Sequence, residues 1–206
     1  MSGAFPISSA KFSTLGIKSI QTTIISKSDS GKRLARQIDG QRWGFTASII
    51  TSTRSSVYGE LMAFIVKQRS GKETFTIIPP EIEDARGNES GTILVNGVHA
   101  VGDTTIAMDA FAADGAGRFL AGDFIKFNSH SKIYMVVADV TSSSSASTVT
   151  IEPPLITALA NNGAITYDNV PFTVYLTSDL QEFGTAGTNS SGDLLYKFEF
   201  DVEEAL

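Results

Sequence analysis

The sequence contains no cysteine and only two histidines, His99 and His130. Without cysteine the chain cannot form a disulfide, a thiolate zinc site or a cysteine nucleophile. The HEXXH and EF-hand patterns are missing, and so is the GxSxG motif of many hydrolases. Asp123 and His130 could be an acid/base pair, but they lack a third member, and a turn histidine that caps the backbone is the simpler interpretation. We therefore expect neither an enzyme nor a cofactor.

Long apolar runs and clustered basic residues are also missing. No run approaches the ~20 apolar residues that span a bilayer, and the N-terminus lacks the pattern of a secretion signal. Lys and Arg number 16 against 22 Asp and Glu, which gives a net charge of -6 at pH 7. General nucleic-acid adhesion requires clustered Lys and Arg. We therefore expect no membrane insertion, and DNA would slide past this surface.

What the sequence does contain is β-strand patterns. Hydrophobic residues make up 42% of the 206 residues, enough for one large or two small domains. Short Val-, Ile-, Phe- and Thr-rich segments alternate with Gly, Asn, Ser and Pro turns, as is typical of β-hairpins. In the middle of the chain this pattern predicts five short strands, at 92–95, 104–108, 123–127, 132–138 and 148–151. They suggest a small barrel or sandwich.

The flanking segments have longer patterns. In 41–52, Trp43, Phe45, Ala47 and Ile49 alternate with small or polar residues, which predicts a strand with one buried face. An apolar stripe of helical period predicts one helix over 55–69, capped by Ser55 or Ser56 and ended by Gly71. Strands are also predicted at 17–27, 33–38, 74–78, 171–176 and 194–202. A hairpin turn is expected at Asp39-Gly40 and a flexible loop at 184–192. Residues 1–16 are expected to be a mobile arm or a strand that orders only against a neighbour.

The two C-terminal strands need a sheet, and the N-terminal strands lack partners. The simplest organisation is therefore one discontinuous domain, residues 1–84 and 166–206, with an all-β module inserted at 85–165. The predicted fold class is mainly β.

Two sets of polar residues are candidate site residues. Glu199, Asp201 and Glu203 lie on one face of the last strand, about 7 Å apart. A solvated face is the simpler interpretation, and acid/base work is the alternative. The second set is a contact hairpin in the inserted module, with Asp123, Lys126, His130 and Lys132.

The inserted module could also bind a ligand. Small five-stranded barrels often bind oligonucleotides, but four basic against seven acidic residues at 85–165 have the wrong sign for that. Sugar binding requires exposed aromatic side chains, for which the candidates are Phe111, Phe119, Phe124, Phe127 and Tyr134. A carbohydrate-binding module for attachment to a host surface is therefore the alternative function.

Five segments together resemble a known family. They are QRWGFTASI at 41–49, GDFIKFNSHSKIYMV at 122–136, TIEPPL at 150–155, NVPFTVYLTSD at 169–179 and the C-terminal FGTAGTNSSGDLLYKFEFDVEEAL at 183–206. Their order and spacing resemble the distal tail protein (Dit) of long-tailed, non-contractile bacteriophages, in its two-domain form.

The resemblance implies a fold and a function. The discontinuous domain would be a tail-tube-like β-sandwich with one flanking helix, and the insertion a small OB-like barrel. Six copies would form a ring in the virion, at the tail tip, after synthesis in the host cytoplasm. The partners would be further copies, the tail tube protein, the hub or baseplate, and fibre or collar proteins. DNA and the tape measure would only pass through, and Glu199, Asp201 and Glu203 would face the lumen, where like charge repels DNA.

Overall fold

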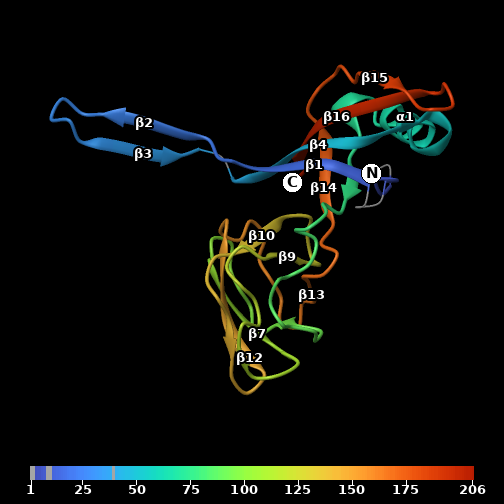
Figure 1. Cartoon of the computed structure of the whole chain (residues 1–206). Helices are drawn as coiled ribbons and strands as arrows, with labels where there is room; N and C mark the ends of the chain where they lie inside the picture. Colours follow the sequence, from blue (N-terminus) through green and yellow to red (C-terminus); the bar gives the residue numbers. More distant parts are fainter. Residues whose placement is uncertain (1–2, 8–10, 39) are drawn as a thin grey trace.

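The computed structural model describes residues 3–7, 11–38 and 40–206. The protein is mainly β, and α1 is the one α-helix of this part of the chain, which confirms the predicted fold class. Figure 1 shows two bodies, one below the other, and a two-stranded arm that projects from the upper body. The predicted turn residue Asp39 lies outside the described residues.

The upper body is built on one antiparallel sheet that both ends of the chain supply. Its strand order is β1-β4-β16-β14-β5, and β15 also pairs with β16. The strands are β1 (Phe12–Ile20), β4 (Arg42–Thr53), β5 (Phe75–Ile77), β14 (Phe172–Leu176), β15 (Phe183–Thr188) and β16 (Leu194–Glu204). The two predicted C-terminal strands, β14 and β16, thus join the sheet begun before the helix, as expected from strands that otherwise lacked partners.

Two segments without a clear strand pattern of their own are ordered by tertiary contacts. The Gly-rich segment after residue 183 forms β15, so the predicted flexible loop is wrong over 184–188. Its backbone pairs with β16, and this pairing does not depend on side-chain pattern. Near the N-terminus, Phe5 is buried against Phe75 and Phe200, and β1 begins at Phe12. No local sequence pattern predicts these contacts.

The helical segment begins with a wide turn. Residues Arg54–Tyr58 form a π-helical turn, and α1 (Gly59–Lys67) follows it. The amide of Gly59 donates to the carbonyl of Arg54, and a Cβ at position 59 would lie 2.8 Å from that same oxygen. No side chain caps either start, so the predicted cap by Ser55 or Ser56 is wrong. Glycine at position 59 permits this tight approach.

The helix ends in a way that the sequence did not predict. A short 3₁₀ turn, Ser70–Lys72, follows α1, and the left-handed residues are Arg69 (φ 52°) and Ser70 (φ 60°) rather than Gly71. At position 71 a Cβ would lie 2.5 Å from the carbonyl oxygen of Leu176. Gly71 is therefore required for close approach to β14, not for a positive φ.

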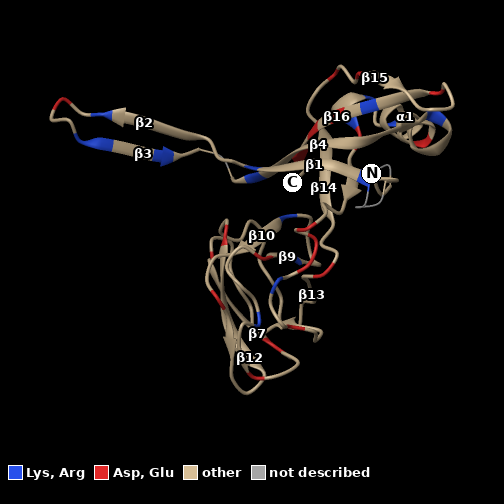
Figure 2. Ribbon diagram, in the orientation of Figure 1, with Lys and Arg blue, Asp and Glu red and all other residues tan. Residues whose placement is uncertain are grey.

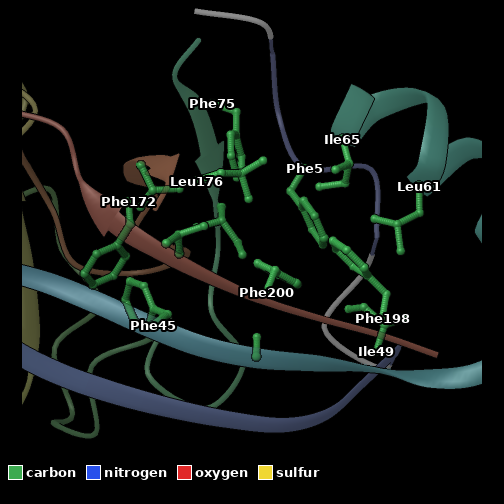
Figure 3. Packing of buried hydrophobic residues seen from close by; sticks show 14 of the residues in the cluster. Phe5, Phe45, Ile49, Leu61, Ile65, Phe75, Phe172, Leu176, Phe198 and Phe200 are labelled. Carbon is green, nitrogen blue, oxygen red and sulfur yellow. The ribbon is translucent and has the colours of Figure 1, made fainter. Parts of the chain in front are cut away.

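The core of the upper body lies between the sheet and α1. Figure 3 shows Leu61 and Ile65 of the helix packed over Phe198 and neighbouring side chains of the sheet. The predicted inward residues of β4, from Trp43 to Ile49, are all buried, which confirms the alternation. The other face of the sheet is polar.

The lower body is a nearly closed barrel. Its strand order is β13-β9-β10-β12-β7-β6. The strands are β6 (Leu94–Val95), β7 (Thr105–Asp109), β9 (Phe124–Phe127), β10 (Ile133–Val136), β12 (Ala146–Glu152) and β13 (Ile165–Thr166). A bridge between Leu94 and Ala164 brings the two edge strands together. The five predicted strands correspond to β6, β7, β9, β10 and β12, and a separate ribbon pairs β8 (Gly115–Ala116) with β11 (Thr141–Ser142).

The arm consists of β2 (Thr23–Lys27) and β3 (Arg33–Gln37), joined by a turn at 28–31. Within the part of the chain that the structure describes, these strands pair only with each other. The arm therefore has no core of its own.

Candidate functional site

The first candidate site is a buried ion pair between the two bodies. Lys132, directly before β10 of the barrel, and Glu204, the last residue of β16, have side chains that are 0% exposed. The Lys132 ammonium donates to Glu204 Oε2 at 2.5 Å, to Gln41 Oε1 at 2.9 Å and to the Gln41 carbonyl at 2.8 Å. All three ammonium hydrogens therefore have acceptors, as a buried charge requires.

Both oxygens of Glu204 are also satisfied. Oε1 accepts from the amide of Ile133 at 2.8 Å, and Oε2 also accepts from the amide of Trp43 at 3.1 Å. The Trp43 indole donates to the carbonyl of Ile133 at 3.0 Å. We call Gln41, Trp43, Lys132, Ile133 and Glu204 the junction network. It joins three segments that are distant in the sequence, from both bodies.

Burial and the ion pair act in opposite directions on the two charged groups. Burial lowers the pKa of Lys132 and raises the pKa of Glu204, while the attraction between them opposes both shifts. Truncation of one partner would leave the other charge buried and uncompensated, which is costly.

Apolar packing continues across the junction. The Trp43 ring meets Phe124 of β9 edge to face, with centroids 5.1 Å apart, and Phe124 meets Phe172 of β14 at 5.7 Å. Phe124 and Ile133 belong to the core of the upper body, although both come from the barrel segment. The two bodies therefore share one core at this point.

The sequence missed Glu204 and Gln41, although a signal was present. In β16, Phe198, Phe200 and Val202 point inward, and the same period of two places Glu204 inward. Gln41 precedes Trp43 and Phe45 with the same spacing of two residues, so it also points inward. A charged or amide side chain at an inward position of a strand predicts a buried polar contact.

The predicted contact hairpin is largely internal. Lys132 lies in the junction network, and Asp123 is buried, where its carboxylate accepts from the backbone amides of Arg86 and Leu120. It also pairs with the Arg86 side chain at 3.2 Å. Asp123 thus holds the 81–90 segment against the barrel and does not meet His130, which follows the other end of β9.

His130 and Lys126 are half-buried. His130 Nε2 lies 2.8 Å from the Tyr134 hydroxyl, and Nδ1 lies 2.9 Å from the Ser129 hydroxyl. Burial, Lys126 and Lys132 lower the pKa of His130, which favours the neutral ring. The Tyr134 hydroxyl also accepts from the amide of Ile156, so these contacts fix a turn of the barrel.

The acidic strand belongs to a face of mixed charge. Asp201 pairs with Lys18 at 2.7 Å and Glu203 pairs with Arg42 at 3.1 Å. Hydrogen bonds from Lys18 and Thr46 lower the pKa of Asp201. With Lys197 on the same side, three basic residues balance the three acidic ones. The predicted repulsion of DNA requires an excess of negative charge, which this face lacks.

The aromatic residues considered for sugar binding are all buried. Phe111, Phe119, Phe124, Phe127 and Tyr134 are each at most 5% exposed. A stacking platform for a sugar requires an accessible ring face, so these residues do not provide one.

Metal sites and membrane-spanning helices are absent from the described residues. No group of three His, Asp or Glu side chains there has the arrangement of a metal site, and no helix there is long and apolar enough to cross a membrane.

No protein-family model matches the chain, and the search of curated proteins finds no match.

Proposed function

We propose that this chain is a structural subunit of a phage tail tip, which associates with further copies of itself into a ring. The observation that carries this proposal is the arm of β2 and β3, in which every residue is exposed. An isolated two-stranded hairpin is only marginally stable in water, so such an arm is typical of a segment that packs against another chain.

The body behind the arm supports the same function. The junction network and the shared core hold barrel and sheet together, so that a load on one body passes to the other. A subunit that connects components of an assembly requires this rigidity.

In the proposed assembly, copies of this chain form a ring, with six as the expected number. The ring joins the tail tube protein to the hub or baseplate, and fibre or collar proteins attach outside. DNA and the tape measure pass through. That the polar sheet face lines the channel remains a prediction from the resemblance, and the balance of its charges would let DNA pass without strong attraction or repulsion.

Sedimentation velocity over a concentration series, with negative-stain electron microscopy of the same samples, tests this function. We expect a discrete oligomer that appears as a closed ring with a central channel. A monomer at every concentration up to the solubility limit, with no rings on the grid, would overturn the proposal.

A further inference from the structure

The arm has exposed aliphatic side chains on both faces. Ile24 and Leu34 lie on one face with Ser26 and Arg36, and Ile25 lies on the other face with Ala35. Thr23 pairs with Gln37, Ile24 with Arg36 and Ser26 with Leu34, so alternation places Ile24, Leu34 and Arg36 on the same face. Ile24 is 58% exposed and Leu34 is 53% exposed. Ile38, which continues this face, is 56% exposed. Contiguous exposed aliphatic side chains of this kind mark an interaction surface.

The arm and the rest of the chain have opposite charge. Residues 23–37 hold four basic residues and one acidic residue, a formal charge of +3. The remaining sequence holds 12 basic and 21 acidic residues, a formal charge of −9. Figure 2 shows Lys and Arg along the arm and an acidic residue at its tip. A second copy of this chain therefore offers the arm a surface of complementary sign.

One groove on the upper body combines exposed apolar and acidic groups. We call it the acidic groove. It lies between the 178–184 segment and β16, and has a volume of about 360 Å³. Leu180, which is 77% exposed, lines it together with Glu182, Glu199 and Asp201, and Lys197 is its one basic lining residue. Because Asp201 already pairs with Lys18, the arm would meet Glu182 and Glu199. Apolar and acidic groups are what an arm with isoleucine, leucine and arginine requires.

The arm does not reach this groove in its own chain. Figure 1 shows the arm extending away from the upper body, whereas the groove lies on that body, against β16. Arm and groove are thus two different patches of one molecule. When such patches pair between copies, the contact is head-to-tail, and repetition gives a closed ring or an open filament.

We propose that the arm of one copy packs into the acidic groove of a second copy, with Ile24 and Leu34 on Leu180 and Arg36 facing Glu199. This contact deepens the proposed function and rests on it, because it assigns the surfaces through which the copies associate. It covers Glu199 with the arm of a neighbouring copy, so in this arrangement Glu199 does not face the channel. Binding buries the face of the arm that carries Ile24 and Leu34 and gives the hairpin the packing that it lacks.

Charge exchange between copies tests the contact by sedimentation velocity. Arg36→Glu places a glutamate of the arm against Glu199, and Glu199→Arg places an arginine of the groove against Arg36. Because like charges then meet, each variant alone should associate at least about fivefold more weakly than the wild type. In an equimolar mixture of the two variants, an alternating assembly matches every arm with a groove of opposite charge. The mixture should therefore regain wild-type association, and so should the double variant.

Replacement of the aliphatic side chains of the arm tests its proposed apolar packing on Leu180. Ile24→Ser with Leu34→Ser should weaken association by about tenfold or more, because these side chains are buried only in the assembly. Lys72→Glu and Val66→Ser are matched controls, since both residues are exposed outside the arm and the groove. The controls should associate like the wild type. Circular dichroism should show that all variants remain folded, because the altered residues lie outside both cores.

The outcomes separate the two proposals. If the wild type forms a ring but the arm and groove variants associate equally well, the arm contact is wrong and the ring remains. If single variants are impaired and the mixture is not restored, arm and groove do not meet. If the wild type stays monomeric, both proposals fail. If Arg36→Glu reduces binding to a duplex DNA probe and leaves self-association unchanged, the arm contacts nucleic acid instead.

Discussion

Removal of one charge from the junction network should be among the most destabilising single changes in this protein. Lys132→Met leaves the Glu204 carboxylate buried without its cation, and Glu204→Gln leaves the Lys132 ammonium without its anion. For side chains that are 0% exposed, loss of one partner costs about 3–5 kcal/mol. That is a large part of the ~5–15 kcal/mol by which proteins of this kind are stable.

The double variant distinguishes the pair from its separate members. In Lys132→Met with Glu204→Gln no uncompensated charge remains. The amide oxygen of the new side chain can accept from one of the two backbone amides, Ile133 or Trp43, and the other amide loses its acceptor. The double variant should therefore lose less stability than the two single variants together, with a coupling of about 1–3 kcal/mol. Lys18→Met is the control. It removes a lysine that is also 2.7 Å from a carboxylate, but with side chains 53% and 49% exposed, so it should cost less than about 1 kcal/mol.

Urea unfolding followed by tryptophan fluorescence measures these effects, because the single tryptophan of the chain, Trp43, lies in the network. Far-UV circular dichroism gives a second probe. In the wild type the unfolding transitions followed by fluorescence and by circular dichroism should coincide, because the two bodies share a core. In either single variant the two transitions should separate, or both should shift to a lower urea concentration. Additive single effects, or a Lys132→Met variant as stable as Lys18→Met, would refute the argument.

Three further changes test other contacts by the same unfolding assay. The pKa of His130 is lowered below its ordinary 6.5, so the unfolded chain takes up this proton first. The contribution of His130 to the free energy of unfolding should be complete above pH 6.5. It should fall as the pH decreases towards the folded pKa, by at most about 1.36 kcal/mol per pH unit. His130→Gln should remove this pH dependence, and an unchanged pH dependence in the variant would contradict the assignment to His130. Gly71→Ala should cost about 1–3 kcal/mol, because its Cβ would meet the Leu176 carbonyl at 2.5 Å; Gly40→Ala, with no atom within 4 Å, is the control, and equal effects would exclude the clash. Tyr58→Phe should cost about 1 kcal/mol, because it removes a buried hydroxyl that bonds to two carbonyls of β4; no loss would show that these long bonds contribute nothing.

The sequence by itself determined most of the segments that form strands and, for β4 and β16, which side chains lie on each face. Period-two alternation predicted the inward residues of β4 and the acidic face of β16, and turn residues predicted the short strands of the barrel. Both signals are local, because a strand turns successive side chains to opposite faces and a turn selects residues that tolerate its backbone.

Only the tertiary structure decided what the polar residues do. Lys132 and Asp123 had the pattern of an exposed hairpin, yet both are buried, because their partners come from other segments of the chain. The acidic strand looked like a surface of one sign until β1 and β4 placed Lys18 and Arg42 beside it. The segment at 183–188 became a strand because β16 offers it hydrogen bonds. Whether a charged side chain is buried, paired or exposed depends on the residues around it. Here those residues are distant in the sequence and come together only in the fold.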